Sequence, residues 1–219
     1  ALLVLCYPNN PTGATASASE LADIAGFARE HDVDVVSDEI YAALTYEGEH
    51  TSIATMPGMT ERTVVINGFS KAYAMTGLRL GYAMGPPEAI TAMNRVHQYA
   101  MLSAPTTAQY AAVEALRSCD GAVEEMRREY DRRRRFVISR FEELGMPCFR
   151  AKGAFYVFPE CPGDDEAFAE GLLKSEGVAV VPGSAFGESG AGHLRVSYAT
   201  GMNDLKEALN RIERYLDSH

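Results

Sequence analysis

The sequence predicts an α/β fold for this chain of 219 residues. Short apolar runs typical of buried parallel strands recur through roughly the first hundred residues, and turns or segments with helical spacing separate them. Beyond Pro105 the pattern changes to helical segments followed by shorter strand-like runs. We therefore expect part of a large, mainly parallel sheet first and a small α/β unit after it.

In the first part, four strands are expected, at residues 1–7, 33–39, 63–69 and 78–84. After the first strand, Ser17 and Glu20 have the spacing of a capping box, which predicts the beginning of a helix. Strands separated by helices imply right-handed parallel crossovers and a sheet that is covered on both faces.

The second part is joined to the first by a predicted long helix at residues 120–144. We place the first domain at 1–130 and the second at 131–219. Asn203 is the expected N-cap of the final helix, whose apolar residues lie on one face. Ala1 opens directly into a strand-like run, so we expect the chain to be the C-terminal portion of a longer protein. Further elements are expected as helices at 106–117 and 165–175 and strands at 153–159, 177–183 and 193–199.

Composition narrows the classes of partner. The formal net charge of -10 argues against nucleic acid and anionic membranes, because both are bound chiefly through positive patches. The basic run 132–135 is surrounded by acidic residues, which is typical of a solvated, salt-bridged helix face. The four cysteines form no C-x-x-C pair, which favours reduced thiols in the cytoplasm. Small molecules are therefore the expected partners.

Polar side chains follow three of the predicted strands where these strands end. Asn10 follows the first, Asp38 and Tyr41 follow the second, and Ser70 and Lys71 follow the third. Ligands of open parallel sheets bind outside the carboxyl ends of the strands, so the topology predicts that these side chains converge. Taken singly, Asp38 could be a helix cap, Tyr41 a core residue and Asn10 a turn former. Their joint placement at one sheet edge favours a functional site.

An amine, a carboxylate and donors of the phenol and amide type suit one cofactor, pyridoxal phosphate. Its aldehyde requires a lysine, its ring nitrogen a carboxylate, and its ring oxygen hydrogen-bond donors. For the phosphate, the hydroxyl of Ser70 and the guanidinium fork of Arg79 are available. The sequence therefore predicts a site for this cofactor.

Four motifs, PNNPTG, SDEIY, GFSKAYAMTGLRLGY and HLRVSYA, occur in this order along the chain. In order and spacing they resemble the motifs of class I/II aminotransferases, which have the fold-type I architecture of pyridoxal-phosphate enzymes. The resemblance implies that Lys71 bonds the cofactor aldehyde and then acts as the acid and base of a 1,3-proton shift. It also implies that Arg195 binds the substrate α-carboxylate in a bidentate pair, although an arginine in a strand could simply pair with a carboxylate of the protein.

The remaining roles follow from the same resemblance. Asp38 would hold the pyridine nitrogen, Tyr41 and Asn10 the ring oxygen, and Ser70 and Arg79 the phosphate. Gly68 departs from the pattern, because many members carry a phosphate-binding serine there. Members also supply a phosphate loop and a ring-stacking aromatic residue before the position of Ala1, so this fragment alone is expected to be inactive.

The resemblance implies transfer of an amino group between an L-amino acid and a 2-oxo acid, with 2-oxoglutarate as the expected acceptor, in a cytoplasmic homodimer. Aspartate, aromatic and alanine-like donors all stay open. Two alternatives remain: a carbon–sulfur β-lyase that uses the same cofactor, and a non-catalytic, aminotransferase-like sensor module. The segment PGSAFG misses the nucleophile elbow G-x-S-x-G, so its glycines are expected to shape a turn beside the substrate.

Overall fold

The structure is a computed structural model that describes residues 1–218. The chain forms two compact units. Unit 1 consists of Ala1–Pro8 and Thr15–Arg127, and unit 2 consists of Asn9–Ala14 with the described residues from Arg128 onwards. The domain boundary expected at residue 130 stays a prediction. The short segment Asn9–Ala14 was not expected to group with the residues after Arg127.

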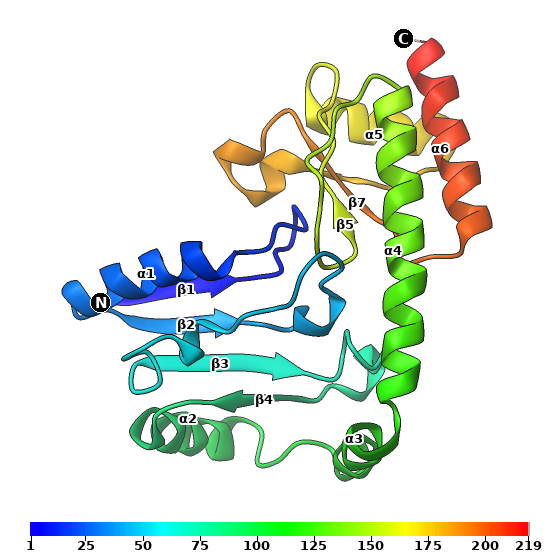
Figure 1. The fold of residues 1–219 in the computed structure, drawn as a ribbon. Helices are drawn as coiled ribbons and strands as arrows, with labels where there is room; N and C mark the ends of the chain where they lie inside the picture. Colours follow the sequence, from blue (N-terminus) through cyan, green and yellow to red (C-terminus); the bar gives the residue numbers. More distant parts are fainter. Residues whose placement is uncertain (219) are drawn as a thin grey trace. The chain divides into compact units, whose positions relative to one another are not determined.

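Unit 1 contains a four-stranded sheet in the order β1 (Leu2–Cys6), β2 (Asp34–Asp38), β3 (Thr63–Gly68) and β4 (Gly81–Met84), as Figure 1 shows. The first three strands are parallel, as expected. The fourth is antiparallel to β3, so the sheet is mainly parallel, as expected, but the implied parallel crossover does not occur at this connection. The reason is local: the connection between β3 and β4 holds only the 3-10 helix η3 (Thr76–Leu78), so the chain turns back beside β3.

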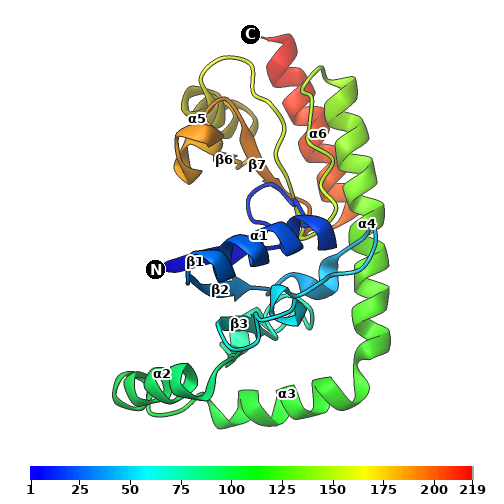
Figure 2. The ribbon, with the colours of Figure 1, turned by 60° about the vertical axis from the view of Figure 1, so that its left-hand side comes forward.

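Helix α1 (Ala18–Glu30) covers one face of this sheet (Figure 2). The predicted capping box is present, since the Ser17 hydroxyl accepts from the Glu20 backbone and the Glu20 carboxylate accepts from the Ser17 backbone. The helix packs its apolar face against the strands through a cluster that includes Leu21, Ala25, Ala28, Val35 and Ile53.

The opposite face of the sheet is not covered in the same way. Leu2 and Val4 of β1 are 63% and 65% exposed, because alternate side chains of a strand point to opposite faces and α1 lies on only one of them. The expectation of a sheet covered on both faces is therefore wrong for the described residues.

Two further helices of unit 1 follow the sheet, α2 (Pro87–Ala100) and α3 (Thr106–Ser118). The sequence reasoning missed α2, although Pro87 at its beginning is a helix-start signal. Helix α3 buries Ala112 and Ala115 against Phe69. Next along the chain, α4 (Asp120–Glu143) begins in unit 1 and ends in unit 2.

Unit 2 has a three-stranded sheet in the order β5 (Tyr156–Val157), β7 (Leu194–Ser197) and β6 (Val181–Pro182), all shorter than expected. Both outer strands are antiparallel to β7. Two helices complete the unit, α5 (Asp165–Glu176) and α6 (Met202–Asp217). The N-cap of α6 is Gly201 rather than the expected Asn203, which lies inside the first turn because the helix begins two residues earlier than expected.

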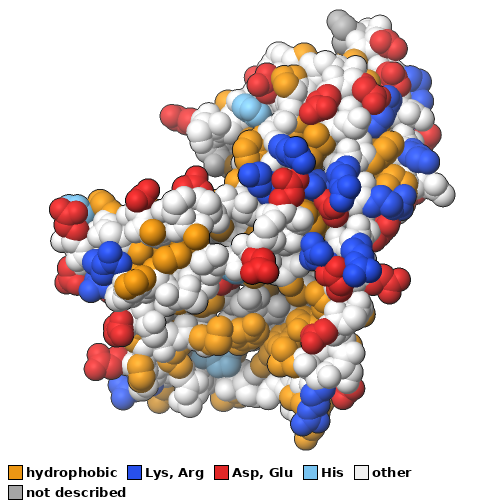
Figure 3. Space-filling model, viewed as in Figure 1, with side chains coloured by type: hydrophobic (Ala, Val, Ile, Leu, Met, Phe, Trp, Pro, Cys, Tyr) orange, Lys and Arg blue, Asp and Glu red, His pale blue; other side chains and the backbone are white. Residues whose placement is uncertain are grey.

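The charged face of α4 agrees with the sequence analysis in part. Figure 3 shows basic and acidic side chains interspersed over this helix, and Glu129 pairs with both Arg132 and Arg133. Arg134 differs: it is 2% exposed, pairs with Asp131 and donates to the Ala151 carbonyl at 2.6 Å. One arginine of the run therefore belongs to the interior, because 3.6 residues per turn place successive residues on different helix faces.

The thiols, the helices and the possible metal ligands of the described residues bear on redox, membrane and metal sites. All four cysteines are free thiols. Of the helices described, none is long and apolar enough to cross a membrane. Residues 1–218 contain no group of three or more His, Cys, Asp and Glu side chains that could hold a metal ion.

Candidate functional site

Asp38 is the last residue of β2, at the carboxyl edge of the sheet of unit 1. The side chain is half-buried, and its Oδ1 atom accepts a hydrogen bond from the backbone N–H of Ile40 at 3.1 Å. The Asp38 carbonyl accepts from the N–H of Tyr7, which follows the neighbouring strand β1. One hydrogen bond therefore orients the carboxylate, and the other holds the backbone of Asp38 at the strand end.

Tyr41 and Lys71 come together at this same sheet edge. Tyr41 is 4% exposed, and the Lys71 Nζ atom lies 5.5 Å from the centroid of its ring. A cation at this distance is attracted to the face of an aromatic ring. The structure thus brings together an amine and a phenol that are thirty positions apart in the sequence, as the parallel topology predicts.

Ser70 and Arg79 lie on the connection between β3 and β4. Ser70 is half-buried, directly before Lys71, whereas Arg79 is exposed. Arg79 has a left-handed backbone with φ of 53°, and its Nη1 atom donates to the Thr76 carbonyl at 2.7 Å. A non-glycine residue in this conformation costs of the order of 1–2 kcal/mol, so the structure holds this arginine in a strained place.

Gly68, where a phosphate-binding serine was expected from the family pattern, has a structural reason to lack a side chain. A Cβ atom there would lie 2.9 Å from the Cα atom of Gly81 and 3.0 Å from the carbonyl oxygen of Leu80. The close approach of the antiparallel strands β3 and β4 therefore excludes a serine unless the backbone shifts.

Glu39 was missed by the sequence reasoning. The side chain is 5% exposed and accepts hydrogen bonds from Ser37 at 2.9 Å and Ser52 at 2.6 Å, with His50 Nε2 at 2.8 Å. Burial opposes its ionisation, but the hydrogen bonds from these three residues outweigh burial and hold the pKa of the Glu39 carboxyl below its usual value. Glu39 ties the segment after β2 to the strand that carries Asp38.

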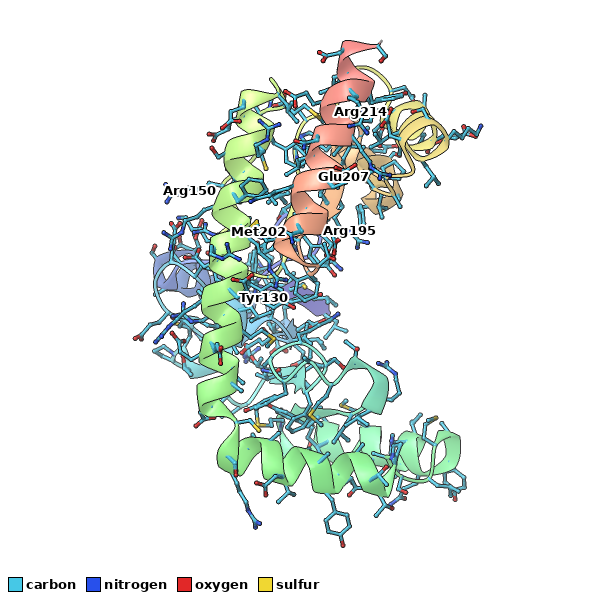
Figure 4. All side chains as sticks on the ribbon, turned by 90° about the vertical axis from the view of Figure 1, so that its right-hand side faces the viewer. Tyr130, Arg150, Arg195, Met202, Glu207 and Arg214 are labelled. Atoms are coloured by element: carbon cyan, nitrogen blue, oxygen red, sulfur yellow. The ribbon has the colours of Figure 1, made fainter. Side chains whose placement is uncertain are left out.

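In unit 2, Arg195 lies in the middle of β7 and is half-buried. Figure 4 labels Arg195, together with Met202 at the beginning of α6. Its Nη1 atom donates to Oδ1 of Asn10 at 3.1 Å. The alternative that this arginine pairs with a carboxylate of the protein is not supported among the described residues, because its hydrogen bond goes to an amide. Two predicted site residues 185 positions apart are thus in contact.

The segment Asn9–Ala14 holds Asn10 in place. Asn9 turns the chain by accepting from both the backbone and the hydroxyl of Thr12. The carbonyl of Gly13 accepts from the backbone N–H groups of Lys152 and Gly153 at 2.9 and 3.0 Å. Backbone hydrogen bonds therefore anchor this segment to the residues that precede β5.

Two aromatic rings contact the Arg195 guanidinium, which the sequence reasoning did not predict. Its Cζ atom lies 4.8 Å from the ring centroid of Tyr156 in β5 and 5.0 Å from that of Phe186. Phe186 ends the 3-10 helix η4 (Gly183–Phe186), within the segment PGSAFG. The predicted turn is present. The sequence signal for the contact with Arg195 was the aromatic residue Phe186 beside the glycines of this turn.

Comparison with known proteins gives consistent results. A family model described as aminotransferase class I and II matches residues 1–212. The chain is 47% identical to an aromatic-amino-acid aminotransferase of Thermococcus litoralis and 47% identical to an aspartate aminotransferase of Pyrococcus abyssi, covering 98% of this chain and 57% of each relative. It superimposes on the crystal structure of an aromatic aminotransferase from Pyrococcus horikoshii with a TM-score of 0.97 and 47% identity, covering 99% of this chain and 60% of that chain. The chain thus spans a little over half the length of these relatives.

Proposed function

Because the chain belongs to the class I and II aminotransferase family, we propose that the protein containing it is a pyridoxal-phosphate-dependent aminotransferase. It moves an amino group between an L-amino acid and a 2-oxo acid. The observation that carries the proposal is the placement of the Lys71 amine 5.5 Å from the Tyr41 ring. Asp38 ends the neighbouring strand of the same sheet.

The donor set of unit 1 fits pyridoxal phosphate. The amine matches the aldehyde, the carboxylate matches the pyridine nitrogen, and the phenol matches the ring oxygen. The hydroxyl and the guanidinium together match the phosphate. When bound, the cofactor supplies a protonated ring that withdraws electrons from the substrate α-carbon. The fit rests on the residue types at the carboxyl edge of the sheet and on the contacts that Asp38, Tyr41, Lys71 and Arg79 make there.

In this proposal, Lys71 would hold the cofactor through its aldehyde, with loss of water. Once the incoming substrate amine had released it, the Lys71 amine would move the proton at the substrate α-carbon as both acid and base. The Asp38 carboxylate keeps the ring nitrogen protonated, and the Ile40 hydrogen bond orients it for that role. The hydroxyl of Tyr41 donates to the ring oxygen. A hydrogen bond restrains the Asp38 carboxylate, burial restrains Tyr41, and Lys71 contacts the Tyr41 ring.

Ser70 and Arg79 bind the phosphate in the same proposal, and Gly68 contributes no side chain to it. In unit 2, Arg195 binds the substrate α-carboxylate in a bidentate pair, and Asn10 donates to the cofactor ring oxygen. The bond from Arg195 to the Asn10 oxygen leaves the amide N–H₂ of Asn10 as its donor side.

The proposed donors are aspartate, aromatic or alanine-like amino acids, and 2-oxoglutarate is the proposed acceptor. Support for the two donor classes comes from the relatives, which are named for aspartate and for aromatic amino acids at equal identity. A panel of amino acids with 2-oxoglutarate tests this by measuring the new amino acid and 2-oxo acid. Release of pyruvate and ammonia from cysteine-type substrates would instead identify a β-lyase.

We propose a cytoplasmic homodimer. Exposed apolar side chains on and beside α2 and α3 support self-association, among them Val96 (70%), Tyr99 (95%), Leu102 (82%) and Tyr110 (76%). Sedimentation of the protein that contains this chain tests the proposal, and a monomer at micromolar concentration would contradict it.

The test of the cofactor site compares wild type, Lys71→Ala and the control Lys206→Ala, which alters an exposed lysine of α6. Each is mixed with pyridoxal phosphate, scanned for visible absorbance, reduced with borohydride, and digested for peptide mass analysis. Wild type and the control should show the band and a pyridoxyl adduct on the peptide of Lys71. Absence of both in wild type would overturn the proposed function.

A further inference from the structure

The segment 183–192 is a built loop rather than a loose connection. It consists of η4 and a second 3-10 helix, η5 (Glu188–Gly190). The Asp165 carboxylate accepts from the backbone N–H of Ser184 at 2.8 Å and of Gly192 at 3.3 Å, so one buried side chain holds both ends. Gly183 and Gly190 are so close that a Cβ atom on Gly183 would overlap the Gly190 carbonyl.

This loop carries one aromatic side chain, Phe186, which contacts the guanidinium of Arg195. Three elements therefore restrain that guanidinium: Phe186 from the loop, Tyr156 from β5, and Asn10 through a hydrogen bond to Nη1. All of them lie in unit 2. An arginine side chain has several rotatable bonds and would otherwise sample many rotamers.

We propose that Phe186 is a positioning residue that holds the Arg195 guanidinium in one orientation, so that the N–H groups in its plane face the ligand. Aromatic rings contact the face of a guanidinium, and its five N–H donors lie in its plane. The ligand class that matches such an edge is a planar anion with two oxygens, a carboxylate. Its identity as the α-carboxylate of an amino acid rests on the proposed function.

The experiment uses the protein that contains the full chain and compares wild type with Phe186→Leu and Phe186→Tyr. Leucine keeps apolar bulk without a ring, and tyrosine keeps the ring. Phe149→Leu is the matched control, because Phe149 is an exposed phenylalanine of the same unit. Phe186 is 38% exposed, so its replacement should leave unit 2 folded; Phe186→Met provides a second ring-free variant if the leucine variant is unstable.

The first readout is the rate at which phenylglyoxal modifies Arg195, followed by peptide mass analysis, with and without succinate. Succinamide, which has the same shape and no charge, is the control ligand, and the exposed Arg132 is the internal reference. In wild type, Phe186→Tyr and Phe149→Leu, succinate should slow the modification of Arg195. In Phe186→Leu the basal rate should rise several-fold and protection should weaken.

The second readout is the reaction with an amino acid and with the amine that lacks its carboxylate. Phe186→Leu should raise KM for the amino acid several-fold, with little change in kcat, and leave the reaction of the amine unchanged. Equal succinate protection in wild type and Phe186→Leu would overturn the positioning role, and no protection in wild type would overturn the ligand class. Protection without any amino transfer would contradict the proposed function alone.

Discussion

The carboxylate of Asp165, at the beginning of α5, accepts the backbone N–H of Ser184, nineteen residues later, at 2.8 Å. This hydrogen bond and a second one from Gly192 lower the pKa of the Asp165 carboxyl, against the opposing effect of burial. The loop that carries Phe186 is thus tied to the N-terminus of a helix, where a negative charge is also favoured by the helix dipole.

Replacement of Asp165 by Asn is expected to destabilise the protein by about 1–3 kcal/mol at pH 7, because two half-buried N–H groups lose a charged acceptor. A carboxyl whose pKa is lowered on folding contributes stability above its unfolded pKa of about 3.9, and this contribution is lost as pH falls through the folded value. The difference between wild type and variant should therefore shrink below about pH 4. Urea unfolding at pH 7 and at pH 3 measures it, and a constant difference would contradict the prediction.

Gly183→Ala should distort the same loop. Its Cβ atom has no room beside the Gly190 carbonyl, so the backbone must shift, at a cost of about 1–3 kcal/mol. Gly26→Ala in α1 is the matched control: nothing lies within 4 Å of its Cβ position, and alanine there should stabilise the helix by about 0.5–1 kcal/mol. Thermal melts should move in opposite directions, and a loss of stability in both variants would argue against the steric account.

His50→Ala removes one of the three hydrogen-bond partners of the buried Glu39 carboxylate. We expect a loss of about 1–3 kcal/mol in the free energy of unfolding at pH 7, because the carboxylate stays buried with one partner fewer. Glu49→Ala, at the exposed position before His50, should be within about 0.5 kcal/mol of wild type. Chemical denaturation distinguishes the two, and equal stabilities would show that His50 contributes nothing to holding Glu39.

Arg79→Lys tests the proposed phosphate contact. Lysine keeps the charge but loses the fork that matches two phosphate oxygens, so pyridoxal phosphate should bind about tenfold more weakly, which corresponds to about 1.4 kcal/mol. Arg117→Lys on α3 provides the control, since this arginine is also exposed. Absorbance titration with the cofactor gives both dissociation constants. Equal affinity in Arg79→Lys and wild type would remove Arg79 from the cofactor site.

Membership of the family and the α/β fold were predictable because local patterns carry them. The capping box of Ser17 and Glu20 needs only neighbouring residues, and the parallel strands β1 to β3 follow from their apolar runs. The match to aminotransferase structures over nearly the whole chain confirms the fold. The polar strand ends were likewise visible, and the structure brings Tyr41 and Lys71 together.

What the sequence did not predict depends on contacts between distant residues. The direction of β4 is set by how the chain after Lys71 turns back, and no apolar pattern encodes that turn. The burial of Arg134 depends on the Ala151 carbonyl that it meets, and the importance of Glu39 depends on His50 and Ser52 folding back onto it. Phe186 likewise meets Arg195 only when β6 and β7 have paired, because Phe186 lies on the connection between these two strands.

The short segment Asn9–Ala14 makes unit 2 discontinuous along the chain. The backbone that binds Gly13 and the arginine that binds Asn10 are made more than a hundred positions after residues 9–14. At about 5–20 residues per second, that interval lasts several seconds or more. Unit 2 can therefore reach its native state only after Arg195 has been translated, and a gene fragment that starts at residue 128 would encode this arginine without its asparagine.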